Sequence, residues 1–270
     1  MKPKRVRVAV TRAFPVRAAV LLVAHGSARY PDAADGLIAH AEALRSDGRV
    51  DQVAVGLLNG DPSVAAALAT LTAEVVHVVP FFMEDGYFSR VAGPRAVNAV
   101  AAGRTLRFCP PVGVHSGMGT LIEQRVLAWC EATGRHPKSV STLLVGHGSA
   151  RAPGRITATH THAAWLSEQG HFAAVQAAFL EESPFVADVL AGCRIDAVVV
   201  VGLFANTGRH ARDDLPGILA AENALRTGPA AEMILIGDDP GMQQIVLDQA
   251  KLRITPRRSR SNAGKSLRFG

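Results

Sequence analysis

Cysteine, aromatic residues and long apolar runs are all scarce in this chain. The three cysteines among its 270 residues, Cys109, Cys130 and Cys193, are too few and too scattered for a disulfide framework or a cysteine-rich zinc or iron–sulfur site. Free thiols fit a reducing compartment, so we expect the protein to be cytoplasmic. No run of about 18 apolar residues occurs, and we therefore expect neither a membrane span nor a signal peptide.

Nucleotide-binding glycine motifs are also missing. Gly148 and Ser149 could stand at a helix N-terminus, where backbone N–H groups attract phosphate, but the chain has no Walker-type or dinucleotide-binding glycine fingerprint. A phosphate-handling enzyme is therefore a poor interpretation. The remaining composition is that of a globular protein, with 48% hydrophobic and 19% charged residues, long enough for one large or two medium domains.

Positive charge is concentrated at the two ends of the chain. The formal net charge is +6, but 13 of the 29 basic residues lie in residues 1–17 and 251–270, where no acid occurs. The rest of the chain has 16 basic and 23 acidic residues. We therefore interpret the ends as solvated basic tails, and we expect neither a nucleic-acid partner nor a membrane partner.

An internal repeat organises the rest of the chain. The segment Leu22–Arg29, LVAHGSAR, returns 122 residues later as Leu144–Arg151, LVGHGSAR. The same offset relates identical residues farther along: Pro62 and Pro184, Val64 and Val186, Phe82 and Phe204, Gly86 and Gly208, Arg90 and Arg212, and Pro94 and Pro216. One register held over this length indicates two fused copies, at residues 18–133 and 140–250.

Each copy alternates short β-branched runs with alanine-rich stretches, a pattern typical of parallel strands joined by crossover helices. The second copy predicts strands at 140–146, 172–180, 196–203 and 231–236, and helices at 156–169, 184–191, 215–225 and 240–250. The first copy predicts strands at 19–24, 51–58, 74–80 and 105–109. The expected fold class is α/β, with two similar doubly wound parallel-sheet halves related by duplication.

Three chemically active residues end neighbouring strands of the second copy. His147 follows the first predicted strand, Glu181 follows the second, and His210 lies in the loop after the third. Ligands of open parallel sheets bind beyond the carboxyl ends of the strands, and two imidazoles with a carboxylate can hold a divalent metal ion. Because side chains alternate along a strand, only one of Glu181 and Glu182 can face this site, and the sequence leaves both open.

The first copy has different residues at the equivalent positions, His25, Asn59 and Phe88. An amide and a phenyl ring cannot replace a carboxylate and an imidazole as ligands, so we expect one metal site per chain, in the second copy. His25 is either a remnant of the repeat or a group that faces the metal from the opposite side. Two other histidines, His160 and His162, lie two apart on a predicted helix, and we expect them on its solvated surface.

These motifs, in this order, resemble those of the sirohydrochlorin cobaltochelatase and ferrochelatase family over roughly residues 18–250. The resemblance rests on His-Gly-Ser at 147–149, Phe-Leu-Glu at 179–181 before a proline, and Gly-x-His at 208–210 followed by Asp-Leu-Pro at 214–216. It implies a bilobal fold of the long, duplicated type that holds a tetrapyrrole between its halves. It also implies that His147 and His210 bind the metal and act in catalysis, with Glu181 as their acidic partner.

The resemblance further implies a lyase that inserts a divalent metal ion into sirohydrochlorin, with the metal as a substrate and no organic cofactor. The long duplicated form favours cobalt, for cobalamin synthesis, over iron for sirohaem, although imidazole and carboxylate ligands suit cobalt, iron and nickel alike. A non-catalytic metal-binding or carrier protein of the same fold is the alternative. We expect a monomer or a weak homodimer.

The many carboxylates of sirohydrochlorin require local cations, because the chain between the tails is net acidic. Guanidinium groups pair with carboxylates through two parallel hydrogen bonds. The candidates for substrate binding are therefore the arginines near the crevice and one hydroxyl: Arg29, Arg151, Arg209, Arg212 and Ser149. Phe88, with Phe82 and Tyr87, either stacks on the macrocycle or packs in the core.

A chain that ends at Leu252 should keep its fold and its metal-insertion activity, because the residues beyond it lack apolar periodicity and lie outside the repeat. Circular dichroism and an insertion assay on the shortened protein measure the two properties. Loss of folding would show that the C-terminal tail packs against the rest of the chain.

Overall fold

The computed structural model describes residues 18–46, 48–101, 103–150, 154–155, 157–193, 195, 197–225 and 230–251. The predictions for Arg151 and for the basic tails, apart from Lys251, therefore lie outside the described residues. Over the part of the chain that is described, no helix has the length and apolar character needed to cross a bilayer.

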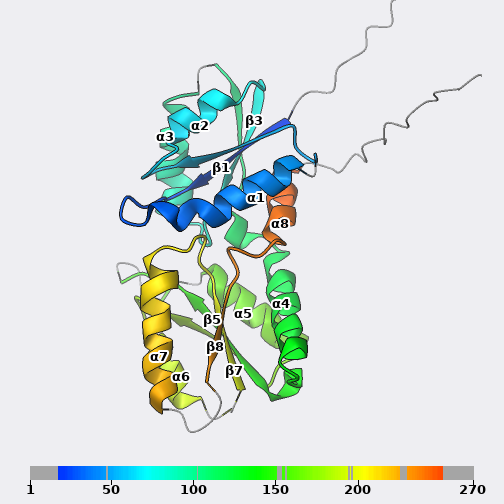
Figure 1. The fold of residues 1–270 in the computed structure, drawn as a ribbon, viewed down its shortest axis with the longest axis vertical. Helices are drawn as coiled ribbons and strands as arrows, with labels where there is room; N and C mark the ends of the chain where they lie inside the picture. The colour runs from blue at the N-terminus through cyan, green and yellow to red at the C-terminus, as the bar shows by residue number, and fades with distance from the viewer. Residues whose placement is uncertain are drawn as a thin grey trace, which may run out of the picture.

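Two parallel four-stranded sheets form the framework, one in each copy of the repeat, and we call the two copies half one and half two (Figure 1). The strand orders are β2-β1-β3-β4 and β6-β5-β7-β8, so the order reverses beside β1 and beside β5. The predicted α/β fold with two similar parallel-sheet halves is confirmed. The strands are β1 (Ala18–Ala24), β2 (Gln52–Leu57), β3 (Val75–Pro80), β4 (Thr105–Phe108), β5 (Val140–Gly146), β6 (Ala174–Phe179), β7 (Ala197–Gly202) and β8 (Glu232–Leu235).

The positions of the elements repeat between the halves. β1, β2 and β3 begin and end 122 residues before β5, β6 and β7, and the same offset relates α2 to α6. The predicted helix at 215–225 coincides with α7, and the ends of the other predicted elements differ from the observed ones by at most two residues. The helices are α1 (Asp35–Ser46), α2 (Val64–Thr70), α3 (Gly93–Asn98), α4 (Met118–Ala132), α5 (Ala158–Gln169), α6 (Val186–Gly192), α7 (Leu215–Leu225) and α8 (Met242–Gln249).

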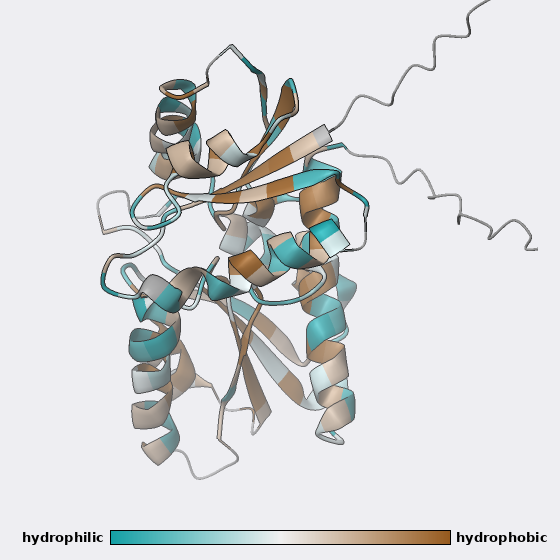
Figure 2. Cartoon of the chain, turned by 45° about the horizontal axis from the view of Figure 1, so that its top comes forward, coloured by the Kyte–Doolittle hydropathy of each residue, from teal (hydrophilic) through white to brown (hydrophobic). Residues whose placement is uncertain are grey.

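The central strands are largely hydrophobic and appear brown in Figure 2. Successive side chains along each strand point to opposite faces of the sheet and pack into two different hydrophobic cores. On β1, Val20 and Leu22 point into a core that both halves share, whereas Leu21 packs against α2 and α3 on the outer face. On β5, Leu144 points into the shared core and Leu143 into the outer one. Full burial of each such side chain contributes about 1.5–3 kcal/mol.

The last helix of each half packs against the other half. α4 lies beside α5 in half two, and α8 lies beside α1 in half one (Figure 1). The ring of Trp165 on α5 packs so closely on Gly119 of α4 that a Cβ atom there would lie 2.6 Å from it. From α8, Gln249 donates a hydrogen bond of 2.8 Å to the carbonyl of Pro111 in half one. The last helix of each half therefore contributes apolar side chains to the core that both halves share.

Two buried histidines, 122 residues apart, join the halves reciprocally. Nε2 of His40 on α1 lies 2.9 Å from the carbonyl oxygen of Gly237, and Nε2 of His162 on α5 lies 2.7 Å from that of Gly113. Each Nε2 donates, because a carbonyl oxygen only accepts. The expectation that His162 lies on a solvated surface is wrong, since α5 turns this face toward half one, while His160 is half-buried. Spacing within one helix does not reveal a contact with another half.

Replacing His162 by glutamine should make stability less sensitive to acid. Burial lowers the pKa of His162, so the unfolded chain binds a proton at a higher pH than the folded chain does. The wild type should therefore lose stability as the pH falls from about 7 to 5, and the glutamine variant, which keeps an N–H donor, should lose less. Urea unfolding at a series of pH values measures the free energy of unfolding of each protein. His171→Gln is the control, because His171 is half-exposed. Equal pH dependence in wild type and H162Q would contradict it.

Candidate active site

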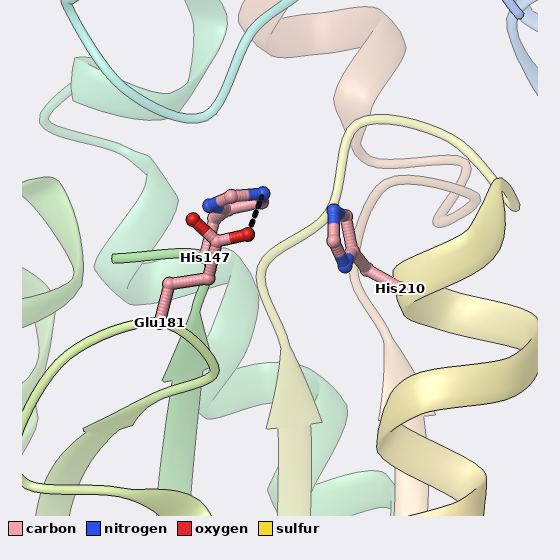
Figure 3. Close-up of side chains that lie close together, drawn as sticks. All are labelled: His147, Glu181 and His210. Atoms are coloured by element: carbon pink, nitrogen blue, oxygen red, sulfur yellow. Dashed lines mark ion pairs between the residues drawn. The ribbon is translucent and has the colours of Figure 1, made fainter. Parts of the chain in front are cut away.

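The three predicted ligands come together at the carboxyl edge of the second sheet. His147 directly follows β5, Glu181 follows β6, and His210 opens a π-helical turn, η5 (His210–Asp214), that leads into α7. Figure 3 shows His147 and Glu181 on one side and His210, at the start of its helix, on the other. Their ligand atoms lie within 4.8 Å of one another, and no other three His, Cys, Asp or Glu side chains converge in this way among the described residues.

Both imidazoles have Nε2 free to face a ligand. Nδ1 of His147 lies 3.0 Å from the carbonyl oxygen of Gly148, and Nδ1 of His210 lies 2.8 Å from Oδ2 of Asp214. These oxygens accept, so each Nδ1 carries the proton and Nε2 of the neutral ring keeps its lone pair. The two ring centroids are 4.2 Å apart with an interplanar angle of 86°.

The ligand set is open to solvent. Nε2 of His147 lies 3.6 Å from Oε1 of Glu181, and these side chains are 43% and 48% exposed. His210 is 32% exposed. Two neutral nitrogens and one carboxylate oxygen suit a divalent metal ion and leave coordination positions free for water or a second ligand.

The neighbouring acid, Glu182, has a different environment. It is buried, and its two carboxylate oxygens accept hydrogen bonds from the backbone N–H groups of Ser149 (3.0 Å) and Gly154 (2.9 Å). Gly148 in the same loop has a φ of +76°, and a Cβ atom there would lie 2.9 Å from Cγ of Glu182. This loop therefore requires glycine at 148, and the structure places Glu181 in the site while Glu182 anchors the loop after His147.

The equivalent place in half one has the same backbone arrangement with other side chains. The N–H of Asn59 donates to the carbonyl of His25 at 2.7 Å, and the equivalent bond in half two is 3.0 Å. The ring of Phe88 lies 4.5 Å from the ring of His25, in the position that His210 takes in half two. Burial lowers the pKa of His25, which keeps its imidazole neutral at pH 7. A phenyl ring offers no lone pair, so half one does not repeat the ligand set.

A cleft of about 1170 Å³ lies between the halves and includes the site. Half one contributes His25 and several aromatic residues to its lining, among them Phe82, Tyr87 and Phe88. Tyr87 and Phe88 are 63% and 41% exposed, so they form part of the cleft wall and not of the core. The ring of Phe88 contacts both other rings. One wall therefore presents several aromatic rings, and the other carries the three candidate ligands.

Some of the predicted substrate-binding residues line the cleft and one described residue does not. Those that line the cleft are Arg29, Ser149, Arg209 and the phenyl ring of Phe88. Arg212 is not among the lining residues, and its Nη1 lies 2.6 Å from Oδ2 of Asp32 in half one. Arg155 does line the cleft, and sequence reasoning misses it because it lies in a loop without a motif.

Comparisons with known proteins agree with the duplicated arrangement of the chain. A family model described as CbiX matches residues 19–128 and, a second time, residues 141–252. A protein from Halobacterium salinarum named "Probable sirohydrochlorin cobaltochelatase" is 32% identical over 222 residues, which are 73% of this chain and 75% of that protein.

Solved structures share the fold. SirB from Bacillus subtilis with Fe3+ matches with a TM-score of 0.70 and 19% identity, over 87% of this chain and 94% of that chain. A structure of CbiX, described as the terminal enzyme for biosynthesis of siroheme in denitrifying bacteria, matches with a TM-score of 0.67 and 24% identity, over 88% and 100% of the two chains. A multi-domain protein from Deinococcus radiodurans, with structural similarity to chelatases, matches 87% of this chain with a TM-score of 0.71 and 27% identity, and this chain covers 54% of its length.

Alanine replacements of the two adjacent acids should affect different properties: folding stability for Glu182 and metal binding for Glu181. Glu182→Ala removes the acceptor of two backbone N–H groups and should lower the free energy of unfolding by about 1–3 kcal/mol. Glu181→Ala removes a half-exposed side chain and should change it by less than about 0.5 kcal/mol, while weakening the binding of Co2+. Urea unfolding and titration calorimetry measure the two effects. A similar loss of stability in both variants would show that Glu181 is also structural.

Proposed function

We propose that this chain, which belongs to the CbiX family, is a chelatase that inserts a divalent metal ion into sirohydrochlorin. The observation that carries the proposal is the convergence of His147, Glu181 and His210 in a cleft whose opposite wall is aromatic. The cleft is slightly larger than the usual small-molecule site of about 300–1000 Å³, as a macrocycle requires.

In this proposal the metal ion is a substrate that His147 and His210 hold through Nε2. The hydrogen bonds from Nδ1 to Gly148 and Asp214 fix the orientation of the rings and make Nε2 more basic. Arg209 pairs with the same Asp214 carboxylate at 3.2 Å, which holds it in place for His210. The metal therefore meets ligands that are already oriented.

Insertion of a divalent ion releases two pyrrole N–H protons, so a base must lie beside the metal. Glu181 fits this role, because its Oε1 is 3.6 Å from Nε2 of His147 and its side chain is 48% exposed. The carboxylate accepts a proton from a pyrrole nitrogen and passes it to solvent, while the freed lone pair binds the metal and a metal-bound water leaves. A second transfer of the same kind completes the insertion.

The macrocycle would lie between the ligands and the aromatic wall of half one. Phe88 and Tyr87 offer exposed rings against which a flat ligand can pack. The substrate carboxylates would meet the polar residues of the cleft, Arg29, Ser149, Arg155 and Arg209, and Arg151, two residues after Ser149 in the sequence, stays a candidate. Binding energy between two walls can bend the ring and turn a nitrogen lone pair toward the metal.

Cobalt is the metal we propose, with a role in cobalamin synthesis, because the Halobacterium relative is named a cobaltochelatase. Imidazole and carboxylate also bind iron and nickel, and iron insertion for sirohaem is the alternative. Insertion rates measured with Co2+, Fe2+ and Ni2+ distinguish these metals. The cytoplasmic location and the monomeric or weakly dimeric state remain predictions.

Replacing His147 or His210 by alanine should slow cobalt insertion by at least about 100-fold, because each change removes a metal ligand. His25→Ala should slow it by less than about fivefold, since His25 lies beside Phe88 and outside the ligand set. The change in the absorption spectrum of sirohydrochlorin under saturating Co2+ measures the rate, and circular dichroism checks the fold.

The three variants are matched, because each removes one imidazole from the lining of the same cleft. If His25→Ala proves as damaging as His147→Ala, the metal is shared across the cleft and its assignment to half two is wrong. If the wild type binds Co2+ and does not insert it, the protein is a metal carrier and not a chelatase.

A further inference from the structure

Two short contacts tie the segment that carries His210 to the opposite half. Nη1 of Arg212 lies 2.6 Å from Oδ2 of Asp32, and the hydroxyl of Tyr30 donates to Oδ2 of Asp213, also at 2.6 Å. Arg212 and Asp213 belong to η5 in half two, whereas Tyr30 and Asp32 follow β1 in half one. We call this pair of contacts the clasp.

The turn η5 is a single π-helical turn, a rare geometry that occurs mostly at functional sites, and half one has the equivalent turn at Phe88–Ala92. The side chains of η5 make contacts in two directions. His210 lies in the metal site, with its Nδ1 held by Asp214, whereas Arg212 and Asp213 contact half one. A shift of this turn would move Nε2 of His210 away from the other two ligands.

The internal repeat allows each clasp residue to be compared with the residue at the equivalent position of the other half. The residues 122 positions after the half-one members of the clasp are Ala152 and Gly154, and neither residue type has a polar side-chain atom that could form a hydrogen bond. The residue equivalent to Arg212 is Arg90, which pairs with Asp85 of its own half at 2.7 Å. Among the described residues, the clasp therefore joins half one to the turn that carries His210, whereas the equivalent arginine of half one pairs within its own half.

We propose that Tyr30 and Asp32 are positioning residues through which half one holds His210 in place for half two. The proposal rests on the proposed function, because it assigns a task to residues around that site. It also assigns Arg212 to the clasp and not to the carboxylates of the substrate. Half one then contributes to the metal site even though it has lost the ligands.

Charge and exposure support this assignment. The hydrogen bond from Arg212 lowers the pKa of Asp32, and the hydrogen bond to Asp213 raises the pKa of Tyr30, so both groups are in the protonation state that the clasp needs at neutral pH. The side chains of Arg212 and Asp32 are 36% and 52% exposed, and exposed ion pairs contribute little to folding stability. Variants of the clasp should therefore fold normally and act through the position of η5.

Charge reversal tests the clasp. Asp32→Arg and Arg212→Asp should each slow cobalt insertion about three- to tenfold and change the visible absorption spectrum of bound Co2+, which reports ligand geometry. The double variant D32R/R212D should restore both to within about twofold, because it rebuilds the ion pair with the charges exchanged. Tyr30→Phe, which removes one hydroxyl, should change the spectrum in the same direction as the single charge reversals.

A matched control is Arg90→Asp, which makes the same charge change at the equivalent position of half one and should leave the Co2+ spectrum unchanged. If Arg212 binds a substrate carboxylate, Arg212→Asp will raise the KM for sirohydrochlorin and the double variant will not restore it. That result, or unchanged Co2+ spectra in both single variants, overturns the proposal. If the wild type binds Co2+ and does not insert it, the chelatase function fails, while the spectra still decide whether the clasp positions His210.

Discussion

The exchange of helices between the two halves is the constraint on which the rest of the structure depends. α4 continues from half one to pack beside α5, and α8 continues from half two to pack beside α1. One core therefore runs through both sheets and contains, among others, Leu22 of β1 and Leu144 of β5. Separation of the halves would expose this apolar surface to water. The cleft thus has two walls that are held at a defined distance by a shared interior.

A shared core also lets the two halves diverge chemically. The backbone hydrogen bond between Asn59 and His25 persists in half one, because it depends on the strand ends and not on the side chains. Phe88 stands where half two has His210, and it is 41% exposed on the cleft wall. Changes at such positions leave the core intact. Half one thus keeps its fold while its cleft wall becomes aromatic.

The strands of each half, and the residues that meet at the end of one sheet, could be predicted from the sequence. Short β-branched apolar runs locate the strands, and the topology of a parallel sheet brings the ends of β5, β6 and β7 to one edge, which is why the sequence predicts that His147, Glu181 and His210 converge. Contacts between the halves could not be predicted, because the pattern of α5 does not say what covers His162. The choice between Glu181 and Glu182 depends on two backbone N–H groups that donate to Glu182, and no sequence pattern marks those bonds.

A metal ion that is a substrate must be bound and then released, and the ligand set suits both steps. Thiolates hold such ions tightly, and the group of ligands contains none. It consists of two imidazoles and a carboxylate whose side chains are 32–48% exposed, so water and pyrrole nitrogens can reach the ion. Because each Nδ1 stays hydrogen-bonded to its acceptor, the rings keep their orientation as the ion leaves. In the proposed reaction the ion exchanges imidazole nitrogens for the four nitrogens of the macrocycle, while two pyrrole protons pass to Glu181 and solvent.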